Sequence, residues 1–388
     1  MTKQNGRNIE EIRKDIDSID KSIVQEFLKR MDVADEIASY KKEHDLPILD
    51  KAREREKIQS ILDMVPDDKK SYAMALFNTL FEVSKSEQAS SNNIEAPIVK
   101  KIEDALESTP KTLIDSAYVA CQGVEGAFSE IAAEKLFKHP NISFFPNFRS
   151  VFKAVDEGFC KYGILPFENS TAGVVNEVYE LMREFDFYIV KTIRLKVSQN
   201  LLAKPGVKLD DITDIYSHQK AIEQSSRFLE ALKDKGVKVH IAENTAMACK
   251  MVSESESKTF AAIGSSNAAN IYNLDFIEKS IEDNNANYTR FAVISNKLEI
   301  YPGADRTSLA ITTKNEAGSL YKVLARFNTL EINLSKLESR TIPNRDFDYM
   351  FYFDLDCSVY SPEFRRLMSS LDDVVEEYRY LGSYSELI

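Results

Sequence analysis

Polar side chains follow an apolar run in the stretch of chain after Gly163. Residues 164–167 are apolar and predict the end of a buried strand, and residues 168–171 then supply a carboxyl, an amide and two hydroxyls. Open α/β sheets build their ligand sites from such groups at strand ends. These four residues are therefore candidates for ligand binding and proton transfer.

A helix is expected to position these groups, because apolar residues recur at helical spacing from Val174 to Leu181. Its unpaired N–H groups and positive end would face the crevice and favour an anion. The competing interpretation is structural, with Ser170 or Thr171 serving as the N-cap of the helix. The stretch alone does not separate the two interpretations.

The 388 residues suffice for about two or three domains. The formal net charge of −12 argues against general binding of nucleic acid, which needs a basic surface. No apolar run is long enough to span a membrane, and the polar N-terminus does not resemble a signal peptide. We expect a soluble, cytoplasmic protein.

The chain has four cysteines and four histidines, and neither set has the spacing of a metal site. The cysteines lie far apart in apolar segments, which is typical of core thiols in a reducing compartment. The sequence also lacks a GxGxxG motif, which argues against a nicotinamide enzyme. We expect neither a metal nor a cofactor.

An apolar residue recurs every three or four positions from Ile9 to Ile37, which predicts one helix of about 34 residues and about 50 Å. A small monomeric domain cannot cover such a helix, so a partner chain is expected, at the simplest in a coiled-coil arm. Arg30 and Lys41 share one face, whereas Arg13 lies about 25 Å from Arg30 along the axis. A second chain could deliver Arg13 to the site of the first.

Two shorter helices are predicted after the long one, the first starting at an acidic residue after Pro47 and the second covering about residues 72–88. They carry polar side chains at defined turns: Asp50, Arg53, Glu54, Ser84 and Gln88. With the three cations of the long helix, this pattern resembles the all-helical chorismate mutase family. The resemblance implies rearrangement of chorismate to prephenate by holding a dianion and stabilising charge on the breaking ether.

The same resemblance implies a role for each matched residue. Three guanidinium groups would bind the substrate carboxylates: Arg13, Arg30 and Arg53. Lys41 and Gln88 would donate to the ether oxygen, and Glu54 would accept the substrate hydroxyl. Asp50 and Ser84 would position these groups. We therefore expect an all-α mutase domain over residues 1–90.

Residues 91–112 are polar and contain prolines, and they predict a linker with one short helix inside it. From residue 115 short apolar strands alternate with helices, which is typical of an α/β domain with a mostly parallel sheet. We expect this domain over residues 113–300. Its predicted strands are Ala117–Cys121, Ile164–Phe167, Tyr188–Ile193, Asp214–Ser217, Val237–Ala242, Thr259–Gly264 and Phe291–Ser295.

Four separated motifs lie in this domain. They are a glycine loop at 122–129, the Glu-Asn-Ser loop at 168–170, the stretch 216–219 with Gln224, and Thr-Arg-Phe at 289–291. Two glycines can let the backbone approach an anion, but alone they are a weak signal. In this order the motifs resemble those of prephenate dehydratase. The resemblance implies two α/β lobes, like a type II periplasmic binding protein, with the active site in the cleft.

The implied reaction converts prephenate to phenylpyruvate with loss of CO₂ and water, so the enzyme must help hydroxide leave and hold both ends of the substrate. Thr289 is expected to donate to the leaving group, and Glu168 is the second candidate acid if burial raises its pKa. The residues expected to anchor the substrate are Asn169, Ser170, His218, Gln224 and Arg290. His218 can equally serve as a helix cap.

Residues 305–388 predict a third domain, with the strand and helix order of a ferredoxin-like βαββαβ unit. Alternation from Phe347 to Leu355 predicts one face of a half-buried strand, and Leu320 to Phe327 predicts a helix stripe. This domain carries no plausible nucleophile or acid–base pair. A purely structural role is therefore one interpretation.

Two short motifs favour regulation instead. They are Gly318, Ser319 and Leu320 at a helix start, and Glu338, Ser339 and Arg340 at a strand end. They resemble the effector-binding motifs of the ACT domain in feedback-inhibited prephenate dehydratases, which implies that L-phenylalanine binds between paired domains. Thr341 and Ser319 depart from the family pattern, which has proline and alanine at these positions.

Together the resemblances imply a bifunctional enzyme of phenylalanine biosynthesis that is inhibited by phenylalanine. We expect at least a homodimer, with a tetramer left open. Two alternatives remain: a dehydratase that uses arogenate, and a non-catalytic amino-acid-sensing module. Comparing the two substrates separates the first, and a lack of turnover of chorismate and prephenate would identify the second.

Overall fold

The computed structural model describes residues 8–44, 51–91, 97–342, 348–372 and 374–388. Its internal contacts divide the chain into two compact units, Met1–Lys101 with Ala310–Arg379 and Ile102–Leu309 with Tyr380–Ile388. Among the described residues, no helix combines the length and apolar character that a membrane span needs.

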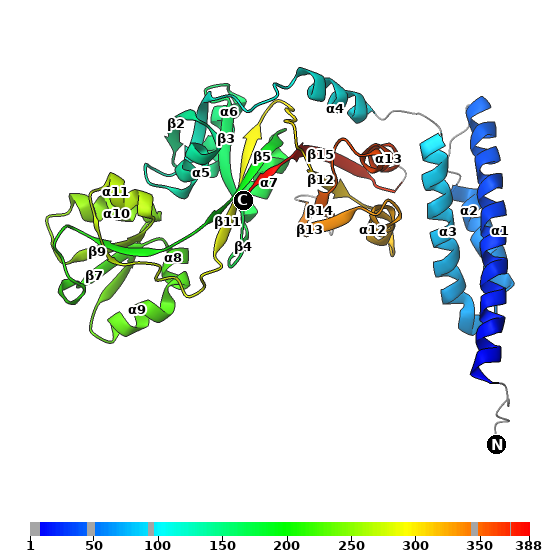
Figure 1. Ribbon diagram of the computed structural model, residues 1–388, viewed down its shortest axis with the longest axis horizontal. Helices are drawn as coiled ribbons and strands as arrows, with labels where there is room; N and C mark the ends of the chain where they lie inside the picture. Colours follow the sequence, from blue (N-terminus) through cyan, green and yellow to red (C-terminus); the bar gives the residue numbers. More distant parts are fainter. Residues whose placement is uncertain (1–7, 45–50, 92–96, 343–347, 373) are drawn as a thin grey trace. The chain divides into compact units, whose positions relative to one another are not determined.

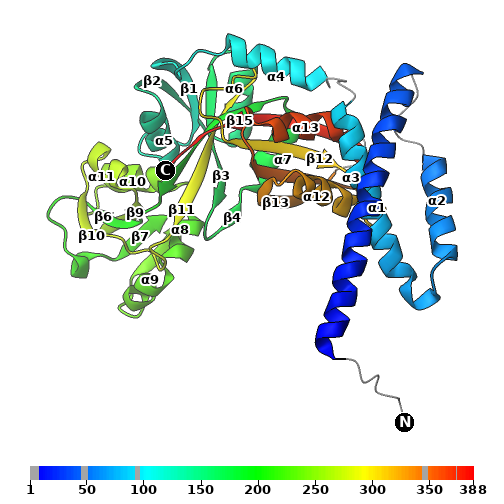
Figure 2. The same ribbon diagram turned by 45° about the vertical axis from the view of Figure 1, so that its right-hand side comes forward.

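Three long helices form the N-terminal part of the first unit, as predicted. They are α1 (Ile9–Glu43), α2 (Lys51–Asp63) and α3 (Lys70–Ser91), with a short 3-10 turn η1 (Asp67–Lys69) between the last two. The Asn8 side chain caps α1 in a capping box with Glu11, which satisfies two of the orphan N–H groups at the helix start. Helix α3 packs against both α1 and α2, and it lies beside α1 in Figures 1 and 2.

The apolar stripe of α1 is largely exposed within one chain. Ile9, Ile16, Ile19 and Ile23 each keep more than half of their surface in contact with solvent. In the described part of this helix, the buried residues are alanines in its second half, Ala34 and Ala38. The stripe is therefore an apolar surface that one chain leaves exposed and that a partner could cover.

The predicted linker contains the expected short helix, α4 (Pro97–Ser108). Its apolar side Val99, Ile102 and Ala105 is buried. The three-residue spacing of these side chains places them on one face and explains why a short helix forms within an otherwise polar segment.

The second unit begins with an α/β lobe. Its sheet contains β1 (Ser116–Gln122), β2 (His139–Phe145), β3 (Tyr162–Asn169), β4 (Gly173–Val174), β5 (Tyr188–Lys196), β11 (Tyr288–Ser295) and β16 (Glu386–Leu387). The strand order is β16-β5-β11-β3-β1-β2, and β4 pairs with β3. Its helices are α5 (Phe128–Leu136), α6 (Phe148–Asp156) and α7 (Asn176–Glu184).

A second α/β lobe is inserted between β5 and β11. Its sheet order is β10-β6-β9-β7-β8, with β6 (Asn200–Ala203), β7 (Asp214–Ser217), β8 (Lys238–Ile241), β9 (Phe260–Gly264) and β10 (Asp275–Glu278). Its helices are η2 (Leu209–Asp211), α8 (Gln219–Gln224), α9 (Ser226–Lys233), α10 (Thr245–Glu254) and α11 (Ser266–Ile271). Figure 2 shows α8 to α11 gathered around these strands. The two lobes that the sequence implied are confirmed.

Two chain segments connect the lobes: residues 197–199, called the first crossing, and residues 279–287, called the second crossing. They pair with each other, because Val197 N donates to Asn287 O at 2.8 Å and Ile281 N donates to Gln199 O at 2.9 Å. The prediction of a mostly parallel sheet was wrong in detail, since both sheets are mixed. Strands β11 and β6, next to these crossings, run antiparallel to their neighbours, because the chain reverses direction as it passes between lobes.

The polar stretch at 168–171 closes a short hairpin instead of preceding a helix directly. Strand β3 continues to Asn169, and Gly173 pairs back onto it in β4. Helix α7 then begins at Asn176 with Val175 as its N-cap. The alternative in which Ser170 or Thr171 caps this helix was therefore wrong.

The C-terminal sheet has the predicted βαββαβ order. Its elements are β12 (Arg306–Thr312), α12 (Ser319–Thr329), β13 (Asn333–Thr341), β14 (Tyr349–Asp356), α13 (Pro362–Ser370) and β15 (Glu377–Tyr384), and the strand order is β13-β14-β12-β15. The prediction of a half-buried β14 was wrong. Both faces are buried from Tyr352 to Leu355, because Tyr352 and Asp354 are covered as well as Phe353 and Leu355. Phe347 lies outside the described residues.

The end of the chain returns to the first lobe. Strand β16 adds to the edge of β5, and the Glu386 carboxylate accepts a hydrogen bond from Arg194 at 2.6 Å. Gly382 has a left-handed φ of 132°, and a Cβ there would clash with the Ile189 carbonyl. Only glycine allows this close approach of the two backbones.

Candidate functional site

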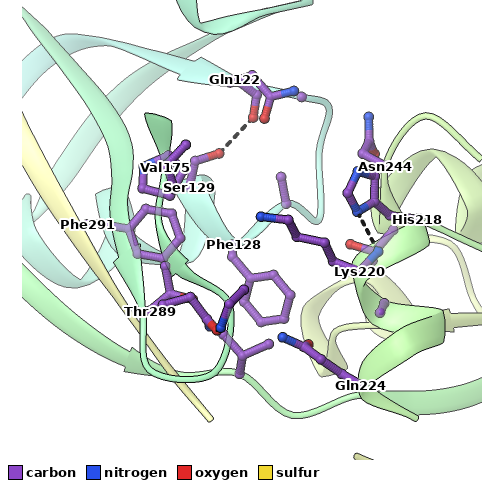
Figure 3. Close-up of a pocket in the computed structure, with 18 of the residues that line it drawn as sticks. Gln122, Phe128, Ser129, Val175, His218, Lys220, Gln224, Asn244, Thr289 and Phe291 are labelled. Atoms are coloured by element: carbon purple, nitrogen blue, oxygen red, sulfur yellow. Dashed lines mark hydrogen bonds between the residues drawn. The ribbon is translucent and has the colours of Figure 1, made fainter. Parts of the chain in front are cut away.

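A cavity of about 460 Å³ lies between the two lobes of the second unit, within the size range of small-molecule sites. Its walls are mostly apolar with several convergent polar groups (Figure 3). The described polar residues that line it are Gln122, Ser129, Asn169, Gln199, His218, Lys220, Gln224, Glu243, Asn244, Thr245 and Thr289. The cleft predicted from the sequence is therefore present.

The hydroxyl of Thr289 is held ready to donate. Thr289 lies on β11 opposite Asn169 on β3, and its hydroxyl oxygen accepts a hydrogen bond from the Asn169 amide at 2.9 Å. Within the described chain this hydroxyl donates to no residue, so its proton can point into the cavity. A hydroxyl whose oxygen is oriented by an amide donor is well placed to donate a hydrogen bond to a leaving group.

Asn169 organises the loop around this hydroxyl. Its amide nitrogen also donates to the Asn287 side chain at 2.7 Å, and its carbonyl oxygen accepts from the backbone N–H groups of Thr171 and Ala172. Ser170 ties the same loop to the second crossing, since it donates to Ala286 O at 2.8 Å. Asn169 lines the cavity, whereas Ser170 is not among its described lining residues.

Gln224 is oriented by two neighbours. Its carbonyl oxygen accepts from Asn287 at 3.0 Å and from Gln199 at 3.3 Å, which leaves its amide group to donate toward the cavity (Figure 3). Gln199 comes from the first crossing, is 3% exposed, and has a side-chain oxygen without a hydrogen-bond partner in the described chain. The crossings therefore supply cavity residues and also connect the lobes.

His218 caps a helix, as one interpretation of the sequence expected, and it also lines the cavity. It is the N-cap of α8, where its Nδ1 accepts from Lys220 N at 3.3 Å. Burial, with a smaller effect of the Lys220 charge, lowers the pKa of His218. The imidazole is therefore neutral near pH 7, with Nε2 as its donor.

Helices from both lobes begin at the cavity. Ala127, Phe128 and Ser129 at the start of α5 line one side, and Asn244 and Thr245 at the start of α10 line the other. The positive ends of these helices favour an anionic ligand.

The two glycines of the first motif have different roles. Gly123 lines the cavity, as expected for approach to an anion. Gly126 has a left-handed φ of 88°, and a Cβ there would come within 3.0 Å of Ala268 on α11. The Ser265 hydroxyl donates to Gly126 O at 2.9 Å. Gly126 therefore allows contact between the lobes and not contact with a ligand.

Glu168 and Arg290, two of the candidate site residues, bind each other. Arg290 Nη2 lies 2.8 Å from Glu168 Oε2, and the two residues face each other in the β11–β3 pair. Neither is among the described residues that line the cavity. Neighbouring residues of a strand point to opposite faces. Because the Thr289 side chain faces the cavity, the Arg290 side chain points away from it.

The helical region brings together part of its predicted set. The Arg30 guanidinium on α1 donates to the Ser84 hydroxyl and to Leu80 O on α3, and lies 5.5 Å from the centre of the Phe81 ring. Burial lowers the pKa of Arg30, but a guanidinium stays charged in proteins. A half-buried cation beside a hydroxyl is suited to a carboxylate ligand.

Two of the other predicted arginines of this region pair with a neighbour on their own helix. Arg13 is exposed and pairs with Glu10 at 2.8 Å, and Arg53 is exposed and pairs with Glu56 at 3.3 Å. Lys41 is half-buried near the end of α1. Asp50 and the side chains of Glu54 and Gln88 lie outside the described residues.

Comparison with known families covers both the helical region and the two-lobed region. Residues 119–299 match the prephenate dehydratase family model, and residues 12–89 match that of chorismate mutase type II. A bifunctional chorismate mutase/prephenate dehydratase of Aquifex aeolicus is 30% identical over 383 residues, which cover 98% of each chain. This chain belongs to that bifunctional family.

Two further similarities bear on the dehydratase part. An Arabidopsis thaliana arogenate dehydratase/prephenate dehydratase is 33% identical over 76% of this chain and 82% of its own length. The structure of an Arthrobacter aurescens prephenate dehydratase in complex with L-Phe is 24% identical and has a TM-score of 0.63 over 69% of this chain and 89% of its own. The second likeness shows that the two chains share a fold.

The two motifs that the sequence analysis expects to bind an effector lie in the C-terminal domain, at the start of α12 and on β13. Gly318 has a left-handed φ of 86° and is the N-cap of α12, and Ser319 and Leu320 form its first turn. On β13, Arg340 pairs with Glu338 at 2.8 Å, and Ser339 between them is exposed.

The sequence motifs of the dehydratase cleft missed several polar groups. Lys220 and Asn287 lie within two residues of His218 and Thr289, so the motifs could have been read more widely. Gln199 lies in a crossing between lobes and has no local pattern that marks it.

Proposed function

We propose that the chain converts chorismate to prephenate in its helical region and prephenate to phenylpyruvate in the cleft. The observation that carries this proposal is the similarity along almost the full chain to a bifunctional relative. The cleft supports it further, with a donor hydroxyl at Thr289 and two helix N-termini beside it.

In the mutase site, Arg30 binds a chorismate carboxylate, and Ser84 holds the guanidinium in place. Arg53 binds the same substrate, and Lys41 and Gln88 donate to the breaking ether. Glu54 accepts the substrate hydroxyl, and Asp50 positions its neighbours. No bond to the protein forms, so the rate arises from orientation and from stabilising charge in the transition state.

The mutase site is shared between two chains of a homodimer. The exposed isoleucines of α1 support this, because a second α1 would bury them. Arg13 of the second chain then enters the site of the first. A tetramer would form by pairing of such dimers.

In the dehydratase site, Thr289 donates to the C4 hydroxyl as it leaves, while the ring carboxylate departs as CO₂ and the ring becomes aromatic. Gln224, Asn169 and His218 position the substrate with their donors. Ser170 supports the loop, and the Glu168–Arg290 pair fixes β3 against β11. Glu168 as the acid remains the second possibility for the proton donor.

Phenylalanine binds the C-terminal domain and inhibits the dehydratase. The fold shared with a chain solved with L-Phe supports this, as do Gly318, Ser319 and Leu320 at the start of α12 and Glu338, Ser339 and Arg340 on β13. Inhibition requires that phenylalanine bind two conformations differently. We also place the protein in the cytoplasm, because its four cysteines are buried and free, as in a reducing compartment.

An arogenate-using dehydratase is the second candidate, favoured by the similarity to a plant chain with both names. The deciding experiment supplies purified protein with chorismate and follows phenylpyruvate, with and without phenylalanine. We expect that phenylpyruvate forms without phenylalanine and that its formation stops when phenylalanine is added. Consumption of chorismate without phenylpyruvate would contradict the second activity, and faster turnover of arogenate than of prephenate would favour the alternative.

A further inference from the structure

The described lining of the cleft contains one residue of the lysine or arginine type, and it is Lys220. The dehydratase substrate is a dianion, so at least one of its carboxylates needs a cationic partner. Arg290 does not line the cleft, because it pairs with Glu168. We propose that Lys220 binds the carboxylate that the substrate keeps in its side chain, an inference that depends on the dehydratase function proposed above.

The local structure indicates a ligand role for this lysine. Lys220 lies in the first turn of α8, where the positive helix end makes a cation unfavourable. Its side chain extends into the cavity in Figure 3. Within the described chain its ammonium group makes no hydrogen bond or ion pair. A cation in an unfavourable helix position is a departure from local rules of the kind found at functional sites.

The course of the reaction decides which carboxylate this is. The bond from the ring to its carboxylate breaks, the electron pair enters the ring, and the C4–oxygen bond breaks as the hydroxide takes a proton. A cation paired with the ring carboxylate would stabilise the substrate and lose its partner as CO₂ forms, which raises the barrier. The side-chain carboxylate keeps its charge throughout. Lys220 on that group binds substrate and transition state equally.

A structural role is the competing explanation. Lys220 also borders a neighbouring opening lined by Glu223, Glu282 and Asp283. An ammonium that only offset these acids would affect folding stability but not ligand binding. Lys220 is exposed, so its substitution does not disturb a core.

The test uses the full chain with Lys220→Met and Lys220→Arg. Lys235→Met is the matched control, because Lys235 is an exposed lysine of the same lobe, pairs with Asp210 and does not line the cleft. The measurements are kcat and KM for prephenate, and binding of the product phenylpyruvate by calorimetry. Phenylpyruvate carries the side-chain carboxylate and lacks the ring carboxylate, so it reports on the proposed contact alone.

We expect Lys220→Met to weaken phenylpyruvate binding and raise KM by about tenfold each, with little change in kcat, as for loss of one charge-assisted hydrogen bond. Lys220→Arg and Lys235→Met should remain close to wild type. A changed kcat with unchanged phenylpyruvate binding would assign Lys220 to the ring carboxylate if kcat rises and to proton transfer if kcat falls, and unchanged values throughout would leave a structural role. Either result overturns the proposal. A wild-type chain that binds phenylpyruvate but does not consume prephenate would instead contradict the dehydratase function.

Discussion

The helical region and the cleft differ in how much of a site one chain contains. In the cleft, residues from β3, β11, α8 and both crossings already touch one another, and Asn169 links Thr289 to Asn287. On the helices, Arg30 meets Ser84, but Arg13 pairs only with its own neighbour Glu10 among the described residues.

Exposure separates the two regions in the same way. Phe291 and Phe167 beside the cleft are at most 4% exposed, whereas Ile9 and Ile23 of α1 are exposed by 57% and 58%. A site between two folded lobes of one chain has its side chains fixed by the cores of those lobes. In the proposed homodimer, the site on the helices would be completed when a second copy buries the apolar stripe of α1. The comparison therefore predicts that the two activities respond differently to substitution and to mixing of chains.

The largest effect is expected from Arg30→Ala. The mutase rate should fall by about a hundredfold or more, as for loss of a preorganised charge in a transition-state site. Turnover of added prephenate should stay near wild type. Lys29→Ala is the control, because Lys29 is exposed and pairs with Glu26. Loss of both activities in Arg30→Ala would contradict the separation of the sites.

Thr289→Val should have the converse effect. The valine keeps the shape and removes the donor, so the dehydratase rate should fall by about a hundredfold while chorismate is still consumed. Thr289→Ser keeps the hydroxyl and should recover much of the rate. A valine variant with a normal dehydratase rate would remove Thr289 from the chemistry.

Mixing tests the shared mutase site. Chains with Arg13→Ala and chains with Arg30→Ala should be nearly inactive alone. After subunit exchange, half of the dimers are mixed and each holds one intact site, so about a quarter of the wild-type mutase rate should return. The dehydratase rate should not change on mixing. No recovery after verified exchange would place Arg13 outside the partner's site.

A smaller effect is expected where the lobes meet. Gly126→Ala introduces a Cβ at a left-handed φ and against Ala268, whereas Gly236→Ala has a similar φ with no atom near the Cβ. Both should lose about 1 kcal/mol of unfolding free energy from backbone strain. Gly126→Ala should lose more and should also lower dehydratase kcat/KM. Equal losses in urea unfolding, with unchanged kinetics, would show that the lobe contact is unimportant.

The smallest effect concerns pH. The pKa of His218 is lowered by burial, so the unfolded chain binds its proton first as the pH falls below the ordinary value of 6.5. Stability should therefore decrease as the pH falls from about 7 through the ordinary pKa of 6.5, and the decrease should end where the folded histidine also becomes protonated. His218→Asn keeps a cap acceptor and should flatten that part of the profile of urea midpoints. If the urea midpoint of the variant changes with pH as that of the wild type does, the pH dependence belongs to groups other than His218.

Particular elements show how far the sequence alone could lead. Apolar residues that recur every three or four positions predicted α1 from Ile9. A local apolar run predicted β7 as Asp214–Ser217. Strands β6 and β10 were missed, because each has only four residues, which is too few for a clear periodic pattern. Their stability comes from pairing with β9 and with each other, which are contacts distant in sequence.

The sequence by itself determined the residue types of both sites and the helices and strands that carry them, because these follow from local spacing. The tertiary structure decided which side chains share the cleft. Strand β11 begins at Tyr288, three residues earlier than predicted, so Thr289 and Arg290 are consecutive strand residues that point to opposite faces. Lys220 of the second lobe and Thr289 of the first line one cavity only when the two lobes fold against each other. Side-chain direction depends on strand register and lobe packing, and neither is encoded in a short motif.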